Sequence, residues 1–235
     1  MGSLRRSDDN SRSKVERVRK DSSPLHHKRL LARPRTSSLN WMYRSTLFEG
    51  YRTMPRFFAF LRAINAGRSR AVRMHVLRQT FESLGFSKVA TFLASGNVVF
   101  ETRAKGMRAL EKKIERKLQQ TLGYSVPVFI RKNQELNEIA TLEPFKDSRG
   151  QGVDVNIIFL VKNLDERSKA KLKTLATETD GFRVHGREVY WWRRKMLGTS
   201  LYSNVPLTRV LSQPFTIRST STMRRLAAKW SSIRS

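Results

Sequence analysis

Cysteine is absent from the 235 residues, which excludes disulfides, thiol nucleophiles and thiolate metal sites. Histidine is also scarce, and of the four histidines only His75 and His185 lie beyond residue 53. The sequence contains no H-E-x-x-H, no Walker loop, no G-x-S-x-G and no G-x-G-x-x-G. The sequence therefore identifies no catalytic residue, no metal site and no cofactor, and whether the protein is an enzyme stays open.

Long apolar runs are missing as well. A membrane-spanning helix needs roughly 20 apolar residues, whereas the nearest run, residues 153–161, is interrupted by Asp154 and Asn156. The N-terminus lacks the apolar segment of a signal peptide. We therefore expect a soluble protein, and the absence of cysteine is consistent with a reducing, cytoplasmic location.

Acidic residues are few, with 19 against 47 basic residues and a formal net charge of +28. Residues 1–53 hold 13 of the basic and five of the acidic residues, so the rest of the chain still carries +20. Such a charge favours anionic partners, namely nucleic acid, anionic membranes or acidic proteins. The alternative is a generally basic proteome, or a basic surface that serves only solubility.

The segment 1–53 has no sustained hydrophobic period, and its composition is typical of a disordered basic extension. It could be an arm that binds nucleic acid or an Arg/Ser-rich transit peptide, although Asp8, Asp9, Glu16 and Asp21 argue against transit. Met54 stands just before the first predicted strand, and we expect it to be the true start of the protein.

The hydrophobic pattern predicts a βαββαβ order in the first half, residues 54–131. The expected elements are strand 57–61, helix 71–84, strand 88–93, strand 98–101, helix 107–122 and strand 126–130. The second half, residues 132–235, repeats this order, with a short helix capped by Asn133 before it and a helix 222–230 after it. We predict an α+β fold, a duplicated ferredoxin-like protein with an extra C-terminal helix.

Two polar loops interrupt the first half. One follows the first strand and contains Arg62, Asn65 and Gly67, and the other is the hairpin turn Ser95-Gly96-Asn97. A strand-to-helix loop can bind an anion through backbone N–H groups and arginines. The alternative is an ordinary turn, because Asn and Gly readily adopt positive φ.

The aromatic run Tyr190-Trp191-Trp192 is unusual for a strand. Consecutive strand residues point to opposite faces, so these side chains cannot all enter one core. One face is therefore a candidate for a ligand platform or for a homodimer interface through Trp191 or Trp192.

Four motifs along the chain resemble one family of small bacterial proteins. They are the segments 60–67 (FLRAINAG), 95–100 (SGNVVF), 186–190 (GREVY) and 216–222 (TIRSTST). In this order, over about residues 55–229, they are similar to domain-of-unknown-function family sixteen-ninety-seven, marked by L-R-G-I-N-x-G and S-G-N-V-V-F. The resemblance implies a duplicated ferredoxin-like fold and no established activity.

The chain departs from that family at several motif positions. Ala63 and Arg68 replace glycines, and Leu201 stands where a lysine usually follows Ser200. Ser219 and Thr220 replace an Asn-Trp pair. If the family has a ligand site, this chain holds it in altered form.

The candidate ligand-binding residues are Arg62, Asn65, Gly67, Ser95, Gly96, Asn97, Ser200 and Arg218. If Arg62, Asn65, Asn97 and Arg218 converge, the two arginines would hold one anion, because half-buried arginines need a negative partner. The competing interpretation pairs one of these arginines with Glu188. Three functions stay open: a binding protein for a phosphate-bearing ligand or nucleic acid, an enzyme that uses the same residues, and a structural or regulatory partner.

Overall fold

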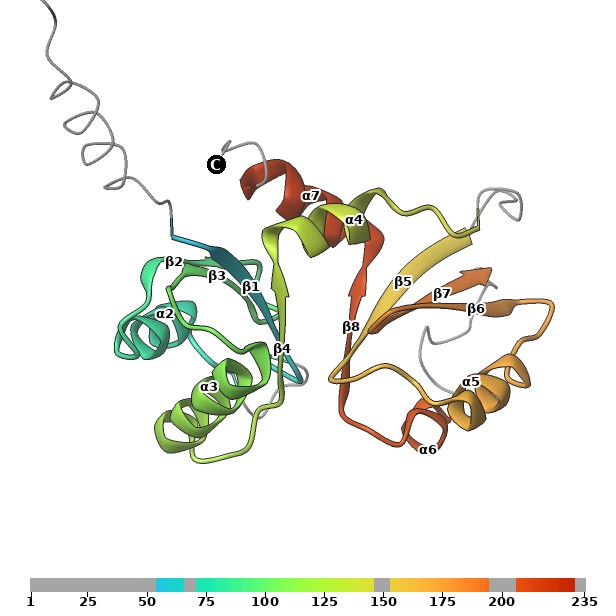
Figure 1. Ribbon diagram of the computed structural model, residues 1–235, viewed down its shortest axis with the longest axis horizontal. Coiled ribbons are helices and arrows are strands. Elements are labelled where there is room, and N and C mark those ends of the chain that lie inside the picture. Colours follow the sequence, from blue (N-terminus) through green and yellow to red (C-terminus); the bar gives the residue numbers. More distant parts are fainter. Residues whose placement is uncertain (1–53, 66–70, 146–152, 195–205, 231–235) are drawn as a thin grey trace, which may run out of the picture. The chain divides into compact units, whose positions relative to one another are not determined.

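A computed structural model describes residues 54–65, 71–145, 153–194 and 206–230, and these described residues belong to one compact unit (Figure 1). The basic extension expected over residues 1–53 lies outside the described residues. In the part of the chain that is described, no helix is both long and apolar enough to cross a bilayer.

The first sheet has four antiparallel strands in the order β2-β3-β1-β4. Its strands and the two helices on one of its faces are β1 (Arg56–Leu61), α2 (Met74–Glu82), β2 (Ser87–Phe92), β3 (Asn97–Glu101), α3 (Met107–Leu122) and β4 (Val128–Lys132). The apolar side of α3 carries Leu110, Ile114 and Leu118 at helical spacing, and all three are buried against this sheet.

The second sheet repeats this order as β6-β7-β5-β8. Its elements are β5 (Val153–Leu160), α5 (Glu166–Lys173), β6 (Asp180–His185), β7 (Glu188–Arg194), α6 (Leu207–Leu211) and β8 (Phe215–Ser219). Leu172 of α5 and Leu211 of α6 pack on one face of this sheet, against residues such as Ile158 and Trp191.

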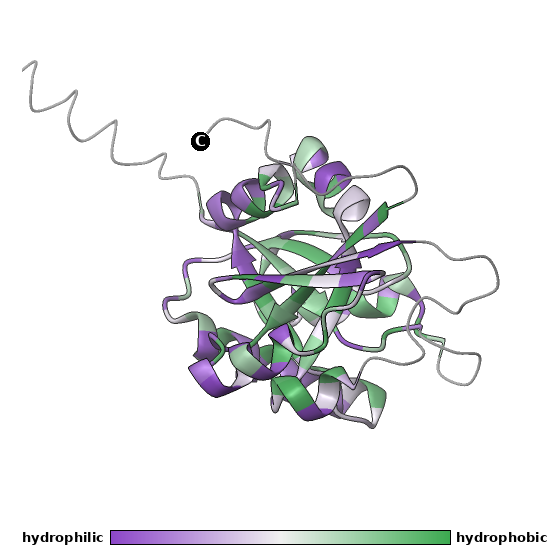
Figure 2. Ribbon diagram, turned by 90° about the vertical axis from the view of Figure 1, so that its right-hand side faces the viewer, coloured by the Kyte–Doolittle hydropathy of each residue, from purple (hydrophilic) through white to green (hydrophobic). Residues whose placement is uncertain are grey.

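The other faces of the two sheets share one core. Phe60 of β1 and Phe159 of β5 pack with ring centroids 4.3 Å apart. Helices α4 (Asn133–Thr141) and α7 (Thr220–Trp230) pack against each other and complete this core. Both faces of each sheet are thus buried, and green, hydrophobic segments gather in the middle of the molecule in Figure 2. This burial explains why β1 is apolar at every position from 57 to 61.

Strand β4 is an edge strand, and glutamates satisfy its free backbone N–H groups. Glu115 accepts a hydrogen bond from Val128 N at 3.0 Å, and Glu111 accepts one from Ile130 N at 3.0 Å. Both glutamates belong to α3, so its two carboxylates point toward the sheet. These bonds remove a cost that buried, unpaired N–H groups would impose.

The predicted order of strands and helices matches the structure, with differences at the ends of elements: β4, for example, spans residues 128–132 rather than 126–130. Helix α2 begins at Met74 rather than at residue 71. The side chain of Asn65 pairs with both the N–H and the C=O of Val72, which holds that residue outside the helix. Asn133 is not the cap of α4: Lys132 is, and the carboxylate of Glu135 accepts from its backbone N–H at 2.7 Å.

Candidate functional site

A cleft of about 540 Å³ lies where the ends of β1 and β8 meet the β2–β3 hairpin. Its lining comes from three segments of the chain and comprises Arg62, Ala63, Ile64, Asn65, Ala94, Ser95, Phe215, Thr216, Ile217 and Arg218. Four of the eight candidates from the sequence line the cleft, namely Arg62, Asn65, Ser95 and Arg218. Gly96 and Asn97 lie behind the lining, whereas Gly67 and Ser200 lie outside the described residues.

Arg218 forms the floor of the cleft and joins the two halves of the chain. The residue is 8% exposed. Its Nη2 donates to the carbonyls of Leu61 and Ser95, each at 2.8 Å, and its Nε donates to Asn97 Oδ1 at 2.7 Å. All these acceptors are neutral. Burial lowers the pKa of Arg218 to about 10, so the guanidinium is still charged at neutral pH.

Asn97 holds the hairpin in place for this contact. Besides accepting from Arg218, its Nδ2 donates to the carbonyl of Phe92 at 2.8 Å and to Ser95 Oγ at 3.1 Å. The side chain is 1% exposed and all of its polar atoms are used, so it has no group left for a ligand. Asn97 therefore positions Arg218 and Ser95.

Asn65 fixes the loop after β1. It has φ of +56°, and its Nδ2 donates to the carbonyls of Val72 and Ala94 at 3.1 and 2.9 Å. Its Oδ1 accepts from Val72 N at 2.6 Å. These bonds join the loop to the approach of α2 and to the β2–β3 hairpin, so Asn65 shapes the cleft wall.

Arg62 is the half-buried cation at the cleft, and it stacks on an aromatic ring. Its guanidinium carbon lies 5.0 Å from the centre of the Phe215 ring. Among the described residues it forms no ion pair, so its donors are available to a ligand or to water. An arginine held against a ring by a cation–π contact is well suited to bind a planar or tetrahedral anion.

Two hydroxyls in the lining complete the set of donors. Ser95 Oγ accepts from Asn97, and Thr216 Oγ1 accepts from Arg218 Nη1 at 2.8 Å. A hydroxyl that accepts in this way directs its own hydrogen elsewhere, and bonding to a cation makes it a better donor. Sequence reasoning did not select Thr216 or Phe215 as site residues, since nothing in the strand 215–218 distinguishes them from core residues.

A second buried arginine, Arg131 of β4, occupies the corresponding place in the other half. In the strand registers Arg131 is opposite Phe58 of β1, and Arg218 is opposite Ile157 of β5. Arg131 Nη2 donates to the carbonyls of Leu160 and Arg187 at 3.1 and 3.3 Å. It reaches the end of β5 and the β6–β7 hairpin, just as Arg218 reaches β1 and the β2–β3 hairpin.

The two arginines differ in their partners. Arg131 Nε forms a buried ion pair with the carboxylate of Glu188, and burial nevertheless lowers the pKa of Arg131. The expectation that Glu188 pairs with Arg62 or Arg218 was therefore wrong. The sequence does not show that the side chain of Arg131, on β4, reaches the β6–β7 hairpin. Asn97 stands opposite Phe60 in the register, as Glu188 stands opposite Phe159. Within the described residues, no carboxylate pairs with Arg218.

The two consecutive tryptophans lie on opposite faces of the second sheet, Trp191 buried and Trp192 partly buried. Trp191 is 1% exposed, stacks on Phe182 and donates from Nε1 to Asp180 Oδ1 at 2.7 Å. Trp192 packs against the shared core and contacts Phe145 edge-on. Because both faces of the sheet are covered, the alternation of side chains does not require an exposed platform here. A homodimer through these residues has no support from their positions.

The part of the chain that the structure describes contains no cluster of three or more His, Asp or Glu residues that could hold a metal ion. The two four-stranded antiparallel sheets make this an α+β protein. Arg62 and Arg218 give it a positively charged cleft between a strand end and a hairpin. Residues 54–190 match the family described as "Protein of unknown function (DUF1697)", and the chain belongs to it.

One similar solved structure supports the fold. It is titled "The structure of conserved bacterial protein SP0830 from Streptococcus pneumoniae", and it shares 21% sequence identity with a TM-score of 0.59. The match covers 74% of this chain and 98% of that chain. No curated protein matches the chain. The comparisons therefore give the family and the fold.

Replacing Gly96 tests whether the β2–β3 hairpin packs as closely on Ile64 as the structure shows. A Cβ at this position would lie 2.8 Å from Ile64 Cβ, and φ is +76°. We expect Gly96→Ala to lower the free energy of unfolding by about 2–4 kcal/mol, because strain and overpacking add. Gly123 has nearly the same φ, +78°, with no atom within 4 Å of the built Cβ. Gly123→Ala should therefore cost only about 1 kcal/mol in urea unfolding, and equal losses would contradict the close approach.

Proposed function

We propose that this protein binds a small anionic, phosphate-bearing ligand in the cleft between Arg62 and Arg218. The observation that carries the proposal is the charge of Arg218, which lies at the floor of an open cleft without an ion pair to any described carboxylate. Burying a cation is costly unless a negative charge is near. An anion in the cleft would supply that charge.

The second half of the chain supports this proposal by contrast. At the corresponding position Arg131 has the carboxylate of Glu188, so that half carries its own anion. Asn97 supplies only an amide oxygen to Arg218. The substitution of an amide for a carboxylate leaves the first half with one positive charge more, next to the cleft.

The lining residues have different roles in the proposed site. The guanidinium nitrogens of Arg218 all donate hydrogen bonds to protein acceptors. Arg218 would therefore attract the ligand through its charge and not through hydrogen bonds. Arg62 would contact the anion directly, and the hydroxyls of Ser95 and Thr216 would orient it. The described lining contains no carboxylate and no histidine, so no general base is at hand. We therefore propose binding and not turnover.

The same comparison of halves supports a proposal about the fold. We infer that residues 54–131 and 132–235 are two ferredoxin-like βαββαβ units with an extra C-terminal helix. The two sheets have the same strand order, and Arg131 and Arg218 occupy matching positions in their edge strands. The shared core joins the two units into one body.

Replacing Arg62 tests the proposed site. We expect Arg62→Gln to weaken binding of inorganic phosphate or pyrophosphate tenfold to a hundredfold, since a charged hydrogen bond contributes about 1.5–3 kcal/mol. Isothermal titration calorimetry measures the dissociation constants. The melting temperature should change by no more than a few degrees, because Arg62 is half-buried and stacks on one ring.

Arg225→Gln is the matched control. Arg225 is exposed on α7 and lies 5.5 Å from the centre of the Phe92 ring, so this variant loses the same charge and the same kind of contact outside the cleft. Its phosphate affinity should equal that of the unmodified chain. Equal weakening in both variants, or no heat of binding from the unmodified protein at millimolar phosphate, would refute the proposal.

A further inference from the structure

The solvent face of helix α3 is cationic, because the two glutamates of the helix point toward β4. Residues 103–117 contain nine charged side chains, of which seven are basic and two, Glu111 and Glu115, are acidic. Both carboxylates accept hydrogen bonds from backbone N–H groups of β4. The carboxylates of the helix therefore lie against the sheet, whereas most of its basic side chains lie on the solvent side.

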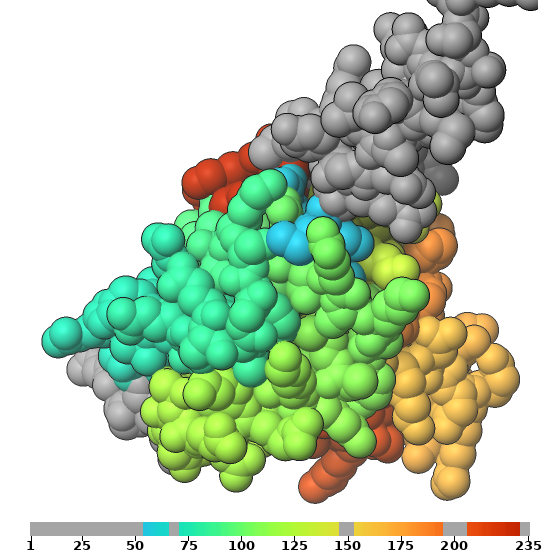
Figure 3. All heavy atoms as spheres, turned by 60° about the vertical axis from the view of Figure 1, so that its left-hand side comes forward, coloured from blue at the N-terminus to red at the C-terminus, as the bar shows by residue number. Residues whose placement is uncertain are grey.

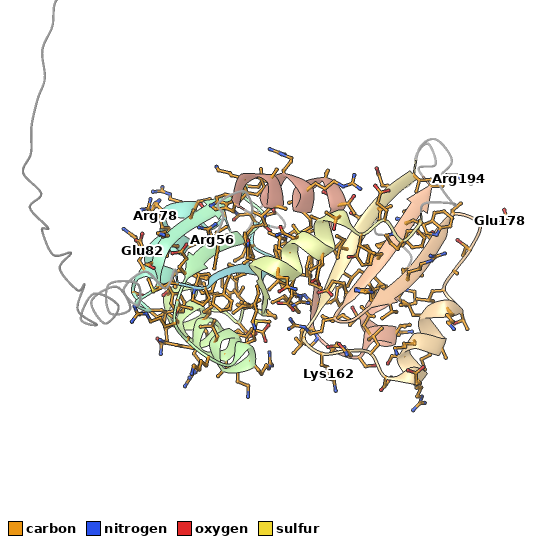
Figure 4. The ribbon with its side chains drawn as sticks, turned by 45° about the horizontal axis from the view of Figure 1, so that its top comes forward. Arg56, Arg78, Glu82, Lys162, Glu178 and Arg194 are labelled. Carbon is orange, nitrogen blue, oxygen red and sulfur yellow. The ribbon has the colours of Figure 1, made fainter. Side chains whose placement is uncertain are left out.

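Most of the seven cations are unpaired within the described residues. Arg108 pairs with Glu111 at 3.1 Å, and Lys113 Nζ donates to the carbonyl of Leu84 at 3.3 Å. The other five form no ion pair with a described carboxylate, and they are Arg103, Lys105, Lys112, Arg116 and Lys117. Side chains ending in nitrogen point from α3 away from the sheet in Figure 4, and the green atoms of the helix lie at the surface in Figure 3.

The cations also follow the axis of the helix. Arg108, Lys112 and Arg116 are spaced by four residues, which places them in one row about 6 Å apart, and Lys113 and Lys117 form a second row beside it. The 16-residue helix is about 24 Å long, so these rows form a linear array of positive charges along its solvent face. A linear array of positive charges is complementary to the regularly spaced phosphates of a nucleic-acid backbone.

We propose that the solvent face of α3, with the preceding segment 103–106, binds the phosphate backbone of duplex nucleic acid without reading its sequence. This surface is separate from the cleft and does not depend on the proposed ligand. The nearby aromatic ring of Phe86 is 6% exposed, so it cannot stack on bases as proteins that bind single strands require.

A membrane surface fits this helix less well. An interfacial helix inserts its apolar stripe among the lipids, whereas Leu110, Ile114 and Leu118 of α3 are at most 4% exposed and pack on the sheet. The helix can therefore offer a bilayer only charge. A helix that offers only charge, with no apolar residues to insert, is better suited to a rigid partner with a dense array of negative groups.

The salt dependence of duplex binding tests the proposal on the full chain. Each phosphate neutralised contributes about −0.9 to the slope of log K against log salt concentration. Substituting glutamine for Lys105, Lys112 and Arg116 should therefore reduce the magnitude of the slope by about 2.7, measured by fluorescence anisotropy with a duplex of about 20 base pairs. A duplex of scrambled sequence should bind equally well.

The control removes the same charges from the other half. Arg167, Lys171 and Lys173 are exposed residues on α5, so their triple replacement by glutamine changes the net charge by the same amount. Residues 1–53 are unchanged in both variants, so their contribution to the slope cancels. We expect the α5 variant and Arg62→Gln each to keep the slope within about one unit of the original.

Several results would overturn this inference. Equal slopes for the α3 and α5 variants would mean that only net charge matters, and a base-sequence preference would mean that another surface reads the duplex. No duplex binding by the unmodified chain at low salt would refute it directly. Stronger binding to anionic vesicles or to polyglutamate than to the duplex would assign the surface to a membrane or an acidic protein instead. Circular dichroism must show that both triple variants remain folded.

Discussion

Replacing Glu188 by alanine is expected to lower the free energy of unfolding by about 3–5 kcal/mol, because removing one partner of a buried ion pair leaves the other charge uncompensated. Arg131, the partner left without a carboxylate, has a side chain that is 1% exposed. Its other hydrogen bonds go to backbone carbonyls of Ile130, Leu160 and Arg187, which carry no full charge. Urea unfolding followed by tryptophan fluorescence measures the loss.

Glu188→Gln should cost less, about 1–3 kcal/mol. It recreates at Arg131 the arrangement that Asn97 already gives Arg218, in which an amide oxygen accepts from the guanidinium Nε. The ordering of the two variants therefore tests whether the corresponding sites are interchangeable. If glutamine destabilised the chain as much as alanine, the amide would be no substitute for the carboxylate, and the comparison between the halves would fail.

The control for Glu188 is an ion pair of the same type on the surface. Arg78 and Glu82 pair on α2 at 2.8 Å with side chains that are 61% and 42% exposed, and both are labelled in Figure 4. Glu82→Ala should cost no more than about 1 kcal/mol, because water screens exposed pairs. A loss at Glu188 no larger than at Glu82 would show that the buried pair does not stabilise the fold.

The order of elements could be predicted from the sequence because local signals identify each element. Helix α3 has apolar residues at helical spacing and stops at Gly123, and the hairpin at Ser95-Gly96 has a typical turn composition. The sequence could not show that both faces of each sheet are buried. That fact depends on how the two sheets pack, and it changes the interpretation of Trp191 and Trp192 from a platform to two cores.

The candidate site was only partly predictable. The motifs brought Arg62, Asn65, Ser95 and Arg218 to attention, and the structure places all four around one cleft. The motifs could not separate residues that hold the loops from residues with free donors, since that distinction requires the hydrogen-bond partners. Arg131 was missed because a basic residue near the end of a predicted strand usually faces solvent, and only the tertiary structure shows that it is fully buried.

Replacing Arg218 by methionine is expected to destabilise the chain by about 3–5 kcal/mol, near the upper limit for a single substitution. Methionine fills part of the volume but donates no hydrogen bond. The carbonyls of Leu61 and Ser95 and the Oδ1 of Asn97 would each lose a donor in a buried place, at about 1–3 kcal/mol for each unsatisfied group. The cost of burying the charge disappears at the same time, which keeps the sum below the total of these losses.

Arg218→Lys separates the hydrogen bonds from the charge. Lysine keeps the positive charge but lacks the planar fork that bridges Leu61 and Asn97, so the free energy of unfolding should still fall by about 2–3 kcal/mol. Because Arg218 acts on the proposed ligand through its charge, phosphate affinity of the folded lysine variant should remain within about threefold, whereas the methionine variant should lose at least tenfold. Calorimetric titration under conditions where both variants are folded decides between these outcomes. If both variants kept phosphate affinity, the buried charge would have no part in binding, and Arg218 would serve only to join the two halves.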